Sequence, residues 1–102
     1  MKPLFQLSTR NYEKEIPLVK KALNELESVC KVQNGFQIGP PENKLGWNFF
    51  NVEISLEMLS VIETSGMMEG AGGYRFPEQL TNFLGHFLEL RGSQVRIKII
   101  NY

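Results

Sequence analysis

Cys30 and His86 carry side chains that can act as a nucleophile and a general base. Each of these residue types occurs once in the chain. Cys30 falls at the centre of an apolar helical stripe, whereas His86 falls about 120° from the centre of a second stripe, at 100° per residue. We therefore predict a buried, inert thiol and a solvated histidine that do not form a catalytic pair.

The other reactive side chains also give no catalytic or metal-binding set. Every acidic residue is Glu, so sites built on clusters of Asp are not expected. A structural zinc site needs four ligands, mostly Cys or His, and the chain has one of each. A single Cys cannot form an internal disulfide, which fits a reducing compartment. We expect no enzyme activity, no catalytic residue, no metal and no other cofactor.

Two carboxylates, Glu53 and Glu57, belong to a segment in which apolar and polar side chains alternate. The alternation from 51 to 58 predicts a half-buried strand with both carboxylates on its polar face. They would lie roughly 13 Å apart at the rise of a strand, too far to couple in acid–base catalysis. A solvated strand face is the simplest interpretation, and the alternative is an acidic strip that attracts a basic partner.

A glycine-rich loop at 66–73 precedes a predicted helix. Its backbone N–H groups could surround a phosphate, but the loop lacks the Lys-Ser/Thr ending of a P-loop. Met67 and Met68 are adaptable apolar side chains of a kind that suits protein contacts. A flexible connection is the first interpretation, a partner-binding loop the second and a phosphate-binding nest the third.

The string Gly-Trp-Asn-Phe-Phe-Asn-Val at 46–52 resembles the third-strand signature of the RNA-recognition motif. In that family a basic residue and a Gly precede alternating aromatics, which stack on bases. Leu-Phe-Gln-Leu at 4–7 is similar to the companion motif on the first strand. Compared with that signature, Lys44 stands one position before the place of the basic residue, and Val52 stands where the last aromatic residue is expected. The resemblance implies a stacking platform of Phe5, Trp47 and Phe49; the alternative is that these aromatics pack the core and cover the sheet.

Hydrophobic periodicity predicts the elements that position these residues. One helix follows a cap at Asn11, carries an apolar stripe from Val19 to Cys30 and ends at Asn34-Gly35, for which a hairpin turn between Val32 and Phe36 is the alternative. A second helix runs from 76 to 91, with one face formed by Leu80, Phe83, Leu84, Phe87, Leu88 and Arg91. Strands are expected at 3–9, 36–38, 45–58 and 94–101, with a loop at 39–43, while 59–64 fits either a bulged strand or a short helix.

The predicted order is β-α-β-β-α-β. This order favours an α+β, ferredoxin-like sandwich of two layers, with an antiparallel sheet of four to five strands and two helices on one face.

Length and charge limit the remaining possibilities. The 102 residues suit one domain spanning 1–102. Lys and Arg number 11 and so do Asp and Glu, which argues against a strongly basic nucleic-acid clamp. Pro3 and Gln6 interrupt any leader-like apolar run, and no apolar stretch is long enough to span a membrane. We expect a cytoplasmic protein that does not bind membranes.

A small domain without a catalytic set is typical of a binding module. The leading hypothesis is an inhibitor, such as an immunity protein that neutralises a basic toxin or nuclease domain by direct binding, an analogy at the level of class. The predicted partner-binding residues are Trp47, Glu53, Glu57, Met67, Met68, Glu69 and Tyr74. The alternative is a nucleic-acid-binding module of ferredoxin-like shape. A third possibility is a ligand-sensing or oligomerising subunit whose outer strands pair between copies.

Overall fold

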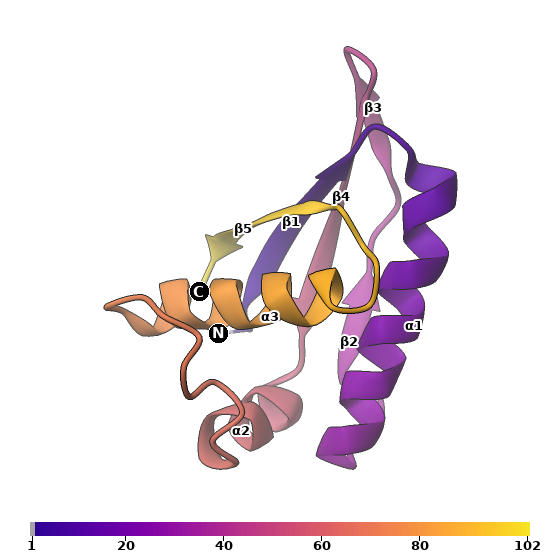
Figure 1. Ribbon diagram of the computed structural model, residues 1–102. Helices are drawn as coiled ribbons and strands as arrows, with labels where there is room; N and C mark the ends of the chain where they lie inside the picture. The colour runs from indigo at the N-terminus through magenta and orange to yellow at the C-terminus, as the bar shows by residue number, and fades with distance from the viewer. Residues whose placement is uncertain (1) are drawn as a thin grey trace.

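A computed structural model describes residues 2–102 (Figure 1). In this part of the chain five strands and three helices follow one another. They are β1 (Leu4–Thr9), α1 (Tyr12–Cys30), β2 (Phe36–Ile38), β3 (Glu42–Lys44), β4 (Trp47–Ile54), α2 (Leu56–Thr64), α3 (Phe76–Glu89) and β5 (Arg96–Asn101).

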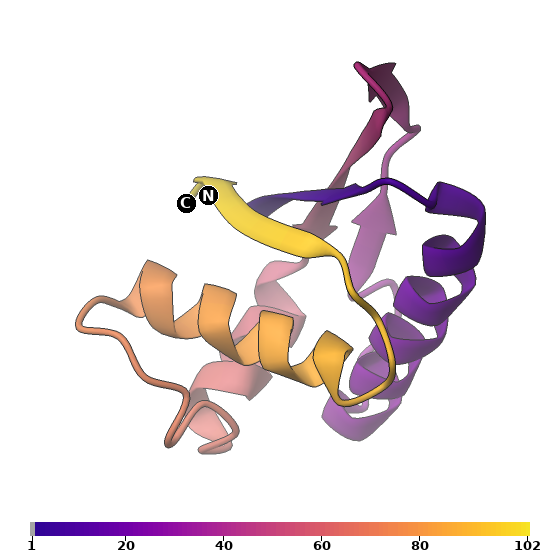
Figure 2. The same cartoon turned by 45° about the horizontal axis from the view of Figure 1, so that its top comes forward.

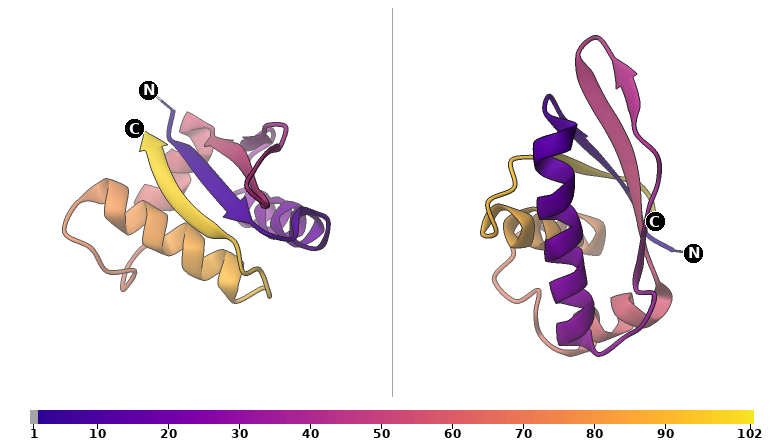
Figure 3. Two further views of the ribbon diagram at one scale, coloured as in Figure 1. Left: turned by 90° about the horizontal axis from the view of Figure 1, so that it is seen from above. Right: turned by 90° about the vertical axis from the view of Figure 1, so that its right-hand side faces the viewer.

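The strands form one antiparallel sheet whose order is β2-β4-β1-β5, with β3 also paired to β4. The helices lie on one side of this sheet, and its other face carries no helix (Figures 2 and 3). The protein is therefore an α+β sandwich of two layers, as expected. It has a third helix, α2, beyond the end of β4, and this helix confirms the short-helix alternative for 59–64.

The strand predicted to run to Met58 ends at Ile54, so this prediction is wrong. Ser55 has an extended backbone, and its Oγ accepts a hydrogen bond from Met58 N at 3.1 Å, which caps α2. The next buried residues are Met58, Leu59 and Ile62, which follow helical spacing. Glu57 consequently lies in the first turn of a helix and does not share a strand face with Glu53.

The predicted loop at 39–43 contains most of a short strand, β3. Leu45 and Gly46 both have positive φ, at 53° and 83°, and connect Lys44 to its register partner Trp47. Two central residues with positive φ are the geometry of the type I′ hairpin turn. Pro40 and Pro41 separate β2 from β3, and both strands pair along β4.

The apolar stripe predicted for the first helix is confirmed in α1. Asn11 caps the helix, since its side chain accepts from Lys14 N at 3.2 Å. The predicted end at Asn34-Gly35 is wrong, because Lys31 takes the left-handed conformation that closes the helix. Val29, predicted on the stripe, is 57 % exposed. The buried residues of the stripe are Val19, Ala22, Leu23, Leu26 and Cys30.

Alternation along the strands divides the sheet into a core face and an open face. Buried side chains of β1 and β4 face the helices and pack with three leucines of α3. The core residues of these elements are Phe5, Leu7, Phe50, Val52, Ile54, Leu80, Leu84 and Leu88. Trp47, Phe49, Asn51 and Glu53 occupy the alternate positions of β4, on the open face.

Candidate functional site

A groove lies between α3 and the loop that follows α2. Its cavity has a volume of ≈ 450 Å³. We call it the α3 groove, and it is lined by Met67, Glu69, Gly70, Ala71, Phe83, His86, Phe87 and Leu90. The loop spans 65–75 and therefore supplies one wall, while the C-terminal half of α3 supplies the other.

The floor of the α3 groove is apolar because α3 carries more apolar residues than the core can cover. Phe83 and Phe87 are one helical turn apart, and their ring centroids lie 5.9 Å from each other. Both are only partly buried against the core, as is Met67 from the loop. Leu90, at the end of α3, is 68 % exposed. These side chains provide a surface that still has apolar area to bury.

Hydrogen bonds from α3 hold the loop wall in place. Asn82 Nδ2 donates to the carbonyl of Gly72 at 3.2 Å, and Gln79 Nε2 donates to the carbonyl of Gly73 at 3.2 Å. Gly73 has φ +108°, and a Cβ there would lie 3.2 Å from the backbone nitrogen of Gln79. Glycine is therefore required where the loop approaches the start of α3.

The rim of the α3 groove is acidic. Glu69 lines both the groove and a neighbouring hollow of ≈ 300 Å³, and Glu63 and Met68 line that hollow as well. Within residues 2–102 the ion pairs are Lys2–Glu53 and Arg91–Glu25. Glu63 and Glu69 therefore have no basic partner in the described chain, and a cation from outside can approach them.

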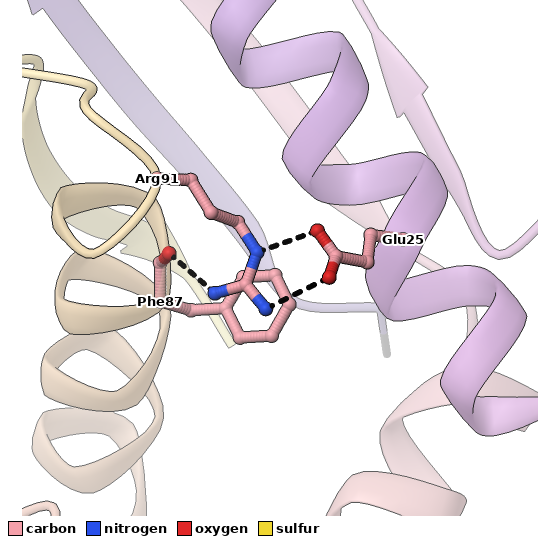
Figure 4. A network of polar contacts seen from close by, with 3 residues as sticks. All are labelled: Glu25, Phe87 and Arg91. Atoms are coloured by element: carbon pink, nitrogen blue, oxygen red, sulfur yellow. Dashed lines mark hydrogen bonds and ion pairs between the residues drawn. The ribbon is translucent and has the colours of Figure 1, made fainter.

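Arg91 lies just after α3, contacts the groove residue Phe87 and joins α3 to α1 (Figure 4). Its Nε and a terminal nitrogen donate to the two carboxylate oxygens of Glu25 at 2.7 and 3.2 Å. A third donor reaches the carbonyl of Phe87 at 3.1 Å, and the guanidinium lies 3.5 Å from the centroid of that ring. Arg91 thus holds the Phe87 ring at the groove. The hydrogen bond from Arg91 lowers the pKa of Glu25 below its ordinary value of 4.5.

Replacing Arg91 by Gln should raise the pKa of Glu25 toward 4.5. Because the folded pKa is lowered, the pair stabilises the protein above pH 4.5, and this stabilisation is lost as the pH falls through the folded pKa. A carboxyl-carbon NMR titration of Glu25 measures the shift, with Lys20→Gln as a control that leaves the pair intact. An unchanged Glu25 titration in the Arg91→Gln variant would show that the pair is absent in solution.

The predicted partner-binding residues do not form a single site. Met67 and Glu69 line the α3 groove, and Met68 lines the neighbouring hollow. Tyr74 belongs to the same loop and is fully exposed, but it lines neither. Glu57 lies in the first turn of α2. Trp47 and Glu53 lie on the open face of the sheet, away from the loop.

The stacking platform implied by the RNA-recognition motif is wrong in one position. Phe5 has no exposed area and points into the core, so it cannot stack on a base. Trp47 and Phe49 do lie on the open face, whereas Phe50 is buried. The alternative that the aromatics pack the core and cover the sheet describes them better, because Phe5 and Phe50 pack the core while Trp47 and Phe49 lie over the open face of the sheet.

Sequence reasoning missed four residues that line the α3 groove. Phe83 and Phe87 fell on the stripe predicted as core, and Leu90 and His86 fell outside it. The predicted face of this helix holds six apolar or amphipathic residues between Leu80 and Arg91, more than contact with one sheet covers, and this width was the available signal.

Cys30 and His86 do not form a nucleophile and base. Cys30 is buried in α1, where burial raises the pKa of its thiol, whereas His86 lines the α3 groove. Among residues 2–102, no three His, Cys, Asp or Glu side chains gather into a possible metal site. No helix in the same range has the length and apolar character needed to cross a membrane.

Comparison of the chain with protein-family models, with curated proteins and with solved structures gives no match.

Proposed function

We propose that this protein is a cytoplasmic protein-binding module that inhibits its partner, as immunity proteins neutralise toxins. The observation that carries the proposal is the α3 groove, which combines an apolar floor with an acidic rim. The partner would insert an apolar side chain between Met67 and the two phenylalanines of α3. Basic residues around that side chain would meet the carboxylates of the rim.

The composition of the floor supports a protein partner. Aromatic residues and Met are enriched where protein interfaces are fully buried, and such contacts contribute much of the binding energy. Phe83, Phe87 and Met67 are residues of these types. Leu90 stands at the edge with most of its side chain exposed, and a protein surface covers such an edge better than a small ligand inside the groove does.

The charge of the rim supports a basic partner. Glu63 and Glu69 have no ion-pair partner within residues 2–102, so their charges act on the approaching molecule. Complementary charge raises association rates and selects partners. A basic toxin or nuclease domain has the required sign, whereas a neutral or acidic partner does not.

We also infer that the fold is an elaborated ferredoxin-like sandwich. Six elements, β1-α1-β2-β4-α3-β5, follow the β-α-β-β-α-β order, and the order β2-β4-β1-β5 places the first and third of the four main strands at the centre. In this interpretation β3 and α2 are additions. The addition of α2 matters most, because the loop after it forms a wall of the α3 groove.

The test is capture of the partner by tagged wild-type and variant proteins from a nuclease-treated lysate of the native host. Leu90→Glu should weaken binding of the captured partner by about thirtyfold, because it places a carboxylate against apolar surface that the partner covers. Val29→Glu is the matched control, because Val29 is an exposed apolar residue on α1. Expression of the partner should arrest growth, and co-expression of the wild-type chain should restore it. Equal binding by the two variants would contradict the site, and a harmless partner would contradict the inhibitor function.

A further inference from the structure

The open face of the sheet presents polar, basic and aromatic side chains in two adjacent rows. Strand register aligns Phe49 of β4 with Ser8 of β1 and Arg96 of β5. The next row along the strands contains Asn51, Gln6 and Lys98. No helix covers this side of the sheet (Figure 3). The rows are therefore open to a partner.

Trp47 is flanked by two cations at one end of this face. The guanidinium carbons of Arg10 and Arg96 lie 4.9 and 4.8 Å from the centroid of its ring. Arg96 is the register partner of Ser8 on β1, and its side chain reaches the Trp47 ring on the strand beyond. Neither guanidinium donates a hydrogen bond or makes an ion pair in the described part of the chain. Their N–H donors are free to bind an anion, and a guanidinium matches the geometry of a phosphate.

A hollow of ≈ 180 Å³ lies beside Phe49 on the same face. Gln6 and Asn51 line it from the strands, and Gly39, Pro40 and Glu42 line it from the segment between β2 and β3. The Gln6 and Asn51 side-chain amides form no hydrogen bond to other described residues, so both a donor and an acceptor are available in each. An unpaired base presents the complementary groups on its edge, and the Phe49 ring can stack on its face.

We infer that this face binds a single-stranded nucleic acid. Arg10 and Arg96 each bind a backbone phosphate beside Trp47, and an unpaired base enters the hollow at Phe49. Lys44 and Lys98 extend the positive charge along the backbone of the strand, while Glu53 at the far end is paired with Lys2 at 3.8 Å. The inference uses none of the residues of the α3 groove, so it stands or fails independently of the proposed function.

Trp47 is the one tryptophan of the chain, so its fluorescence reports directly on this face. The probe is a mixed-sequence RNA strand of about ten nucleotides, with the DNA strand of the same sequence and its duplex as further arms. Both single strands should quench the fluorescence at about 50 mM salt, and the duplex should bind at least about tenfold more weakly because its base edges are paired. The RNA and DNA arms then show which strand is preferred.

Two variants test the assigned roles. Arg10→Gln with Arg96→Gln should lower the slope of log affinity against log salt by about 1.4, the loss of two phosphate contacts. Phe49→Ala should weaken binding about tenfold through lost stacking. Lys20→Gln with Lys21→Gln is the matched control, because it removes equal charge from the exposed surface of α1.

Three results would overturn the inference. One is no quenching of the wild-type protein by either single strand up to about 100 µM, the weak end of nonspecific binding. Another is an equal loss of affinity in the double arginine variant and in the double lysine control. The last is equal quenching by polyglutamate, which would make the face a surface for acidic proteins. The first and last use only the wild-type protein, so a variant that fails to fold does not affect them.

Discussion

Replacing Phe5 with alanine is expected to lower the free energy of unfolding by about 4 kcal/mol, as for other fully buried aromatic residues. Phe5 has no exposed area and lies on β1, between its register partners Val52 of β4 and Ile99 of β5. Removing the ring leaves a cavity where the central strand meets the helices. Equilibrium unfolding in urea, followed by circular dichroism, measures the change.

The matched control is Phe49→Ala, which removes the same ring from the open face of β4. A half-buried ring contributes roughly half of the stabilisation of a fully buried one, so this variant should lower the free energy of unfolding by about 1 kcal/mol. The comparison tests which aromatic faces the core. Equal losses, or a larger loss for Phe49→Ala, would contradict the strand orientation on which the proposed nucleic-acid site depends.

Replacing Glu15 with alanine should lower the free energy of unfolding by about 3 kcal/mol, because two hydrogen bonds to a charged group are lost. Glu15 lies near the start of α1 and is only 3 % exposed. Its Oε1 accepts from Ser93 Oγ at 2.9 Å and from Gln94 N at 2.8 Å. It therefore joins α1 to the segment before β5, and its removal leaves the buried Ser93 hydroxyl without an acceptor for its proton.

Glu13→Ala is the control for this prediction. Glu13 is exposed in the first turn of the same helix, where its charge favours the helix dipole by about 0.5 kcal/mol. The difference between the two variants isolates the buried hydrogen bonds from the effect of the dipole. A Glu15→Ala variant as stable as Glu13→Ala would show that the contact to Ser93 and Gln94 does not form in solution.

Long, regular patterns in the sequence predict most of the fold. The stripe of α1 extends over three turns, and its cap at Asn11 is confirmed. A short helix is one of two alternatives that the sequence allows for 59–64, but the start of α2 at 56–58 is assigned to the preceding strand, because twofold alternation and helical spacing overlap over a few residues around Ser55. The hydrogen bond from Met58 N to Ser55 Oγ and the burial of Leu59 and Ile62 separate the two interpretations, and both are features of the folded protein.

The two candidate sites could be predicted only in part. The chemistry of the glycine-rich loop predicts Met67 and Glu69 as partner-binding residues, and both line the α3 groove. Periodicity places Phe83 and Phe87 on the apolar face of α3, as it does for core residues. It does not show that the 65–75 loop leaves part of each ring exposed. Arg10 and Arg96 are distant in the chain and both approach Trp47 through strand register, which a single sequence does not show.

The two sites lie on different sides of the protein. The α3 groove belongs to the helical layer, whereas the proposed nucleic-acid site lies on the open face of the sheet, which no helix covers (Figure 2). A partner seated in the groove therefore leaves the sheet face open. Saturation of one site should leave affinity at the other unchanged, apart from the long-range effect of charge, which salt screens.

Hydrogen exchange of the purified complex with its captured partner tests the central proposal most directly. Binding in the α3 groove predicts slower exchange than in the free protein at residues 65–71 and 83–90, with little change in β1, β4 and β5. Protection confined to these strands, with the loop and α3 unchanged, would contradict the proposal.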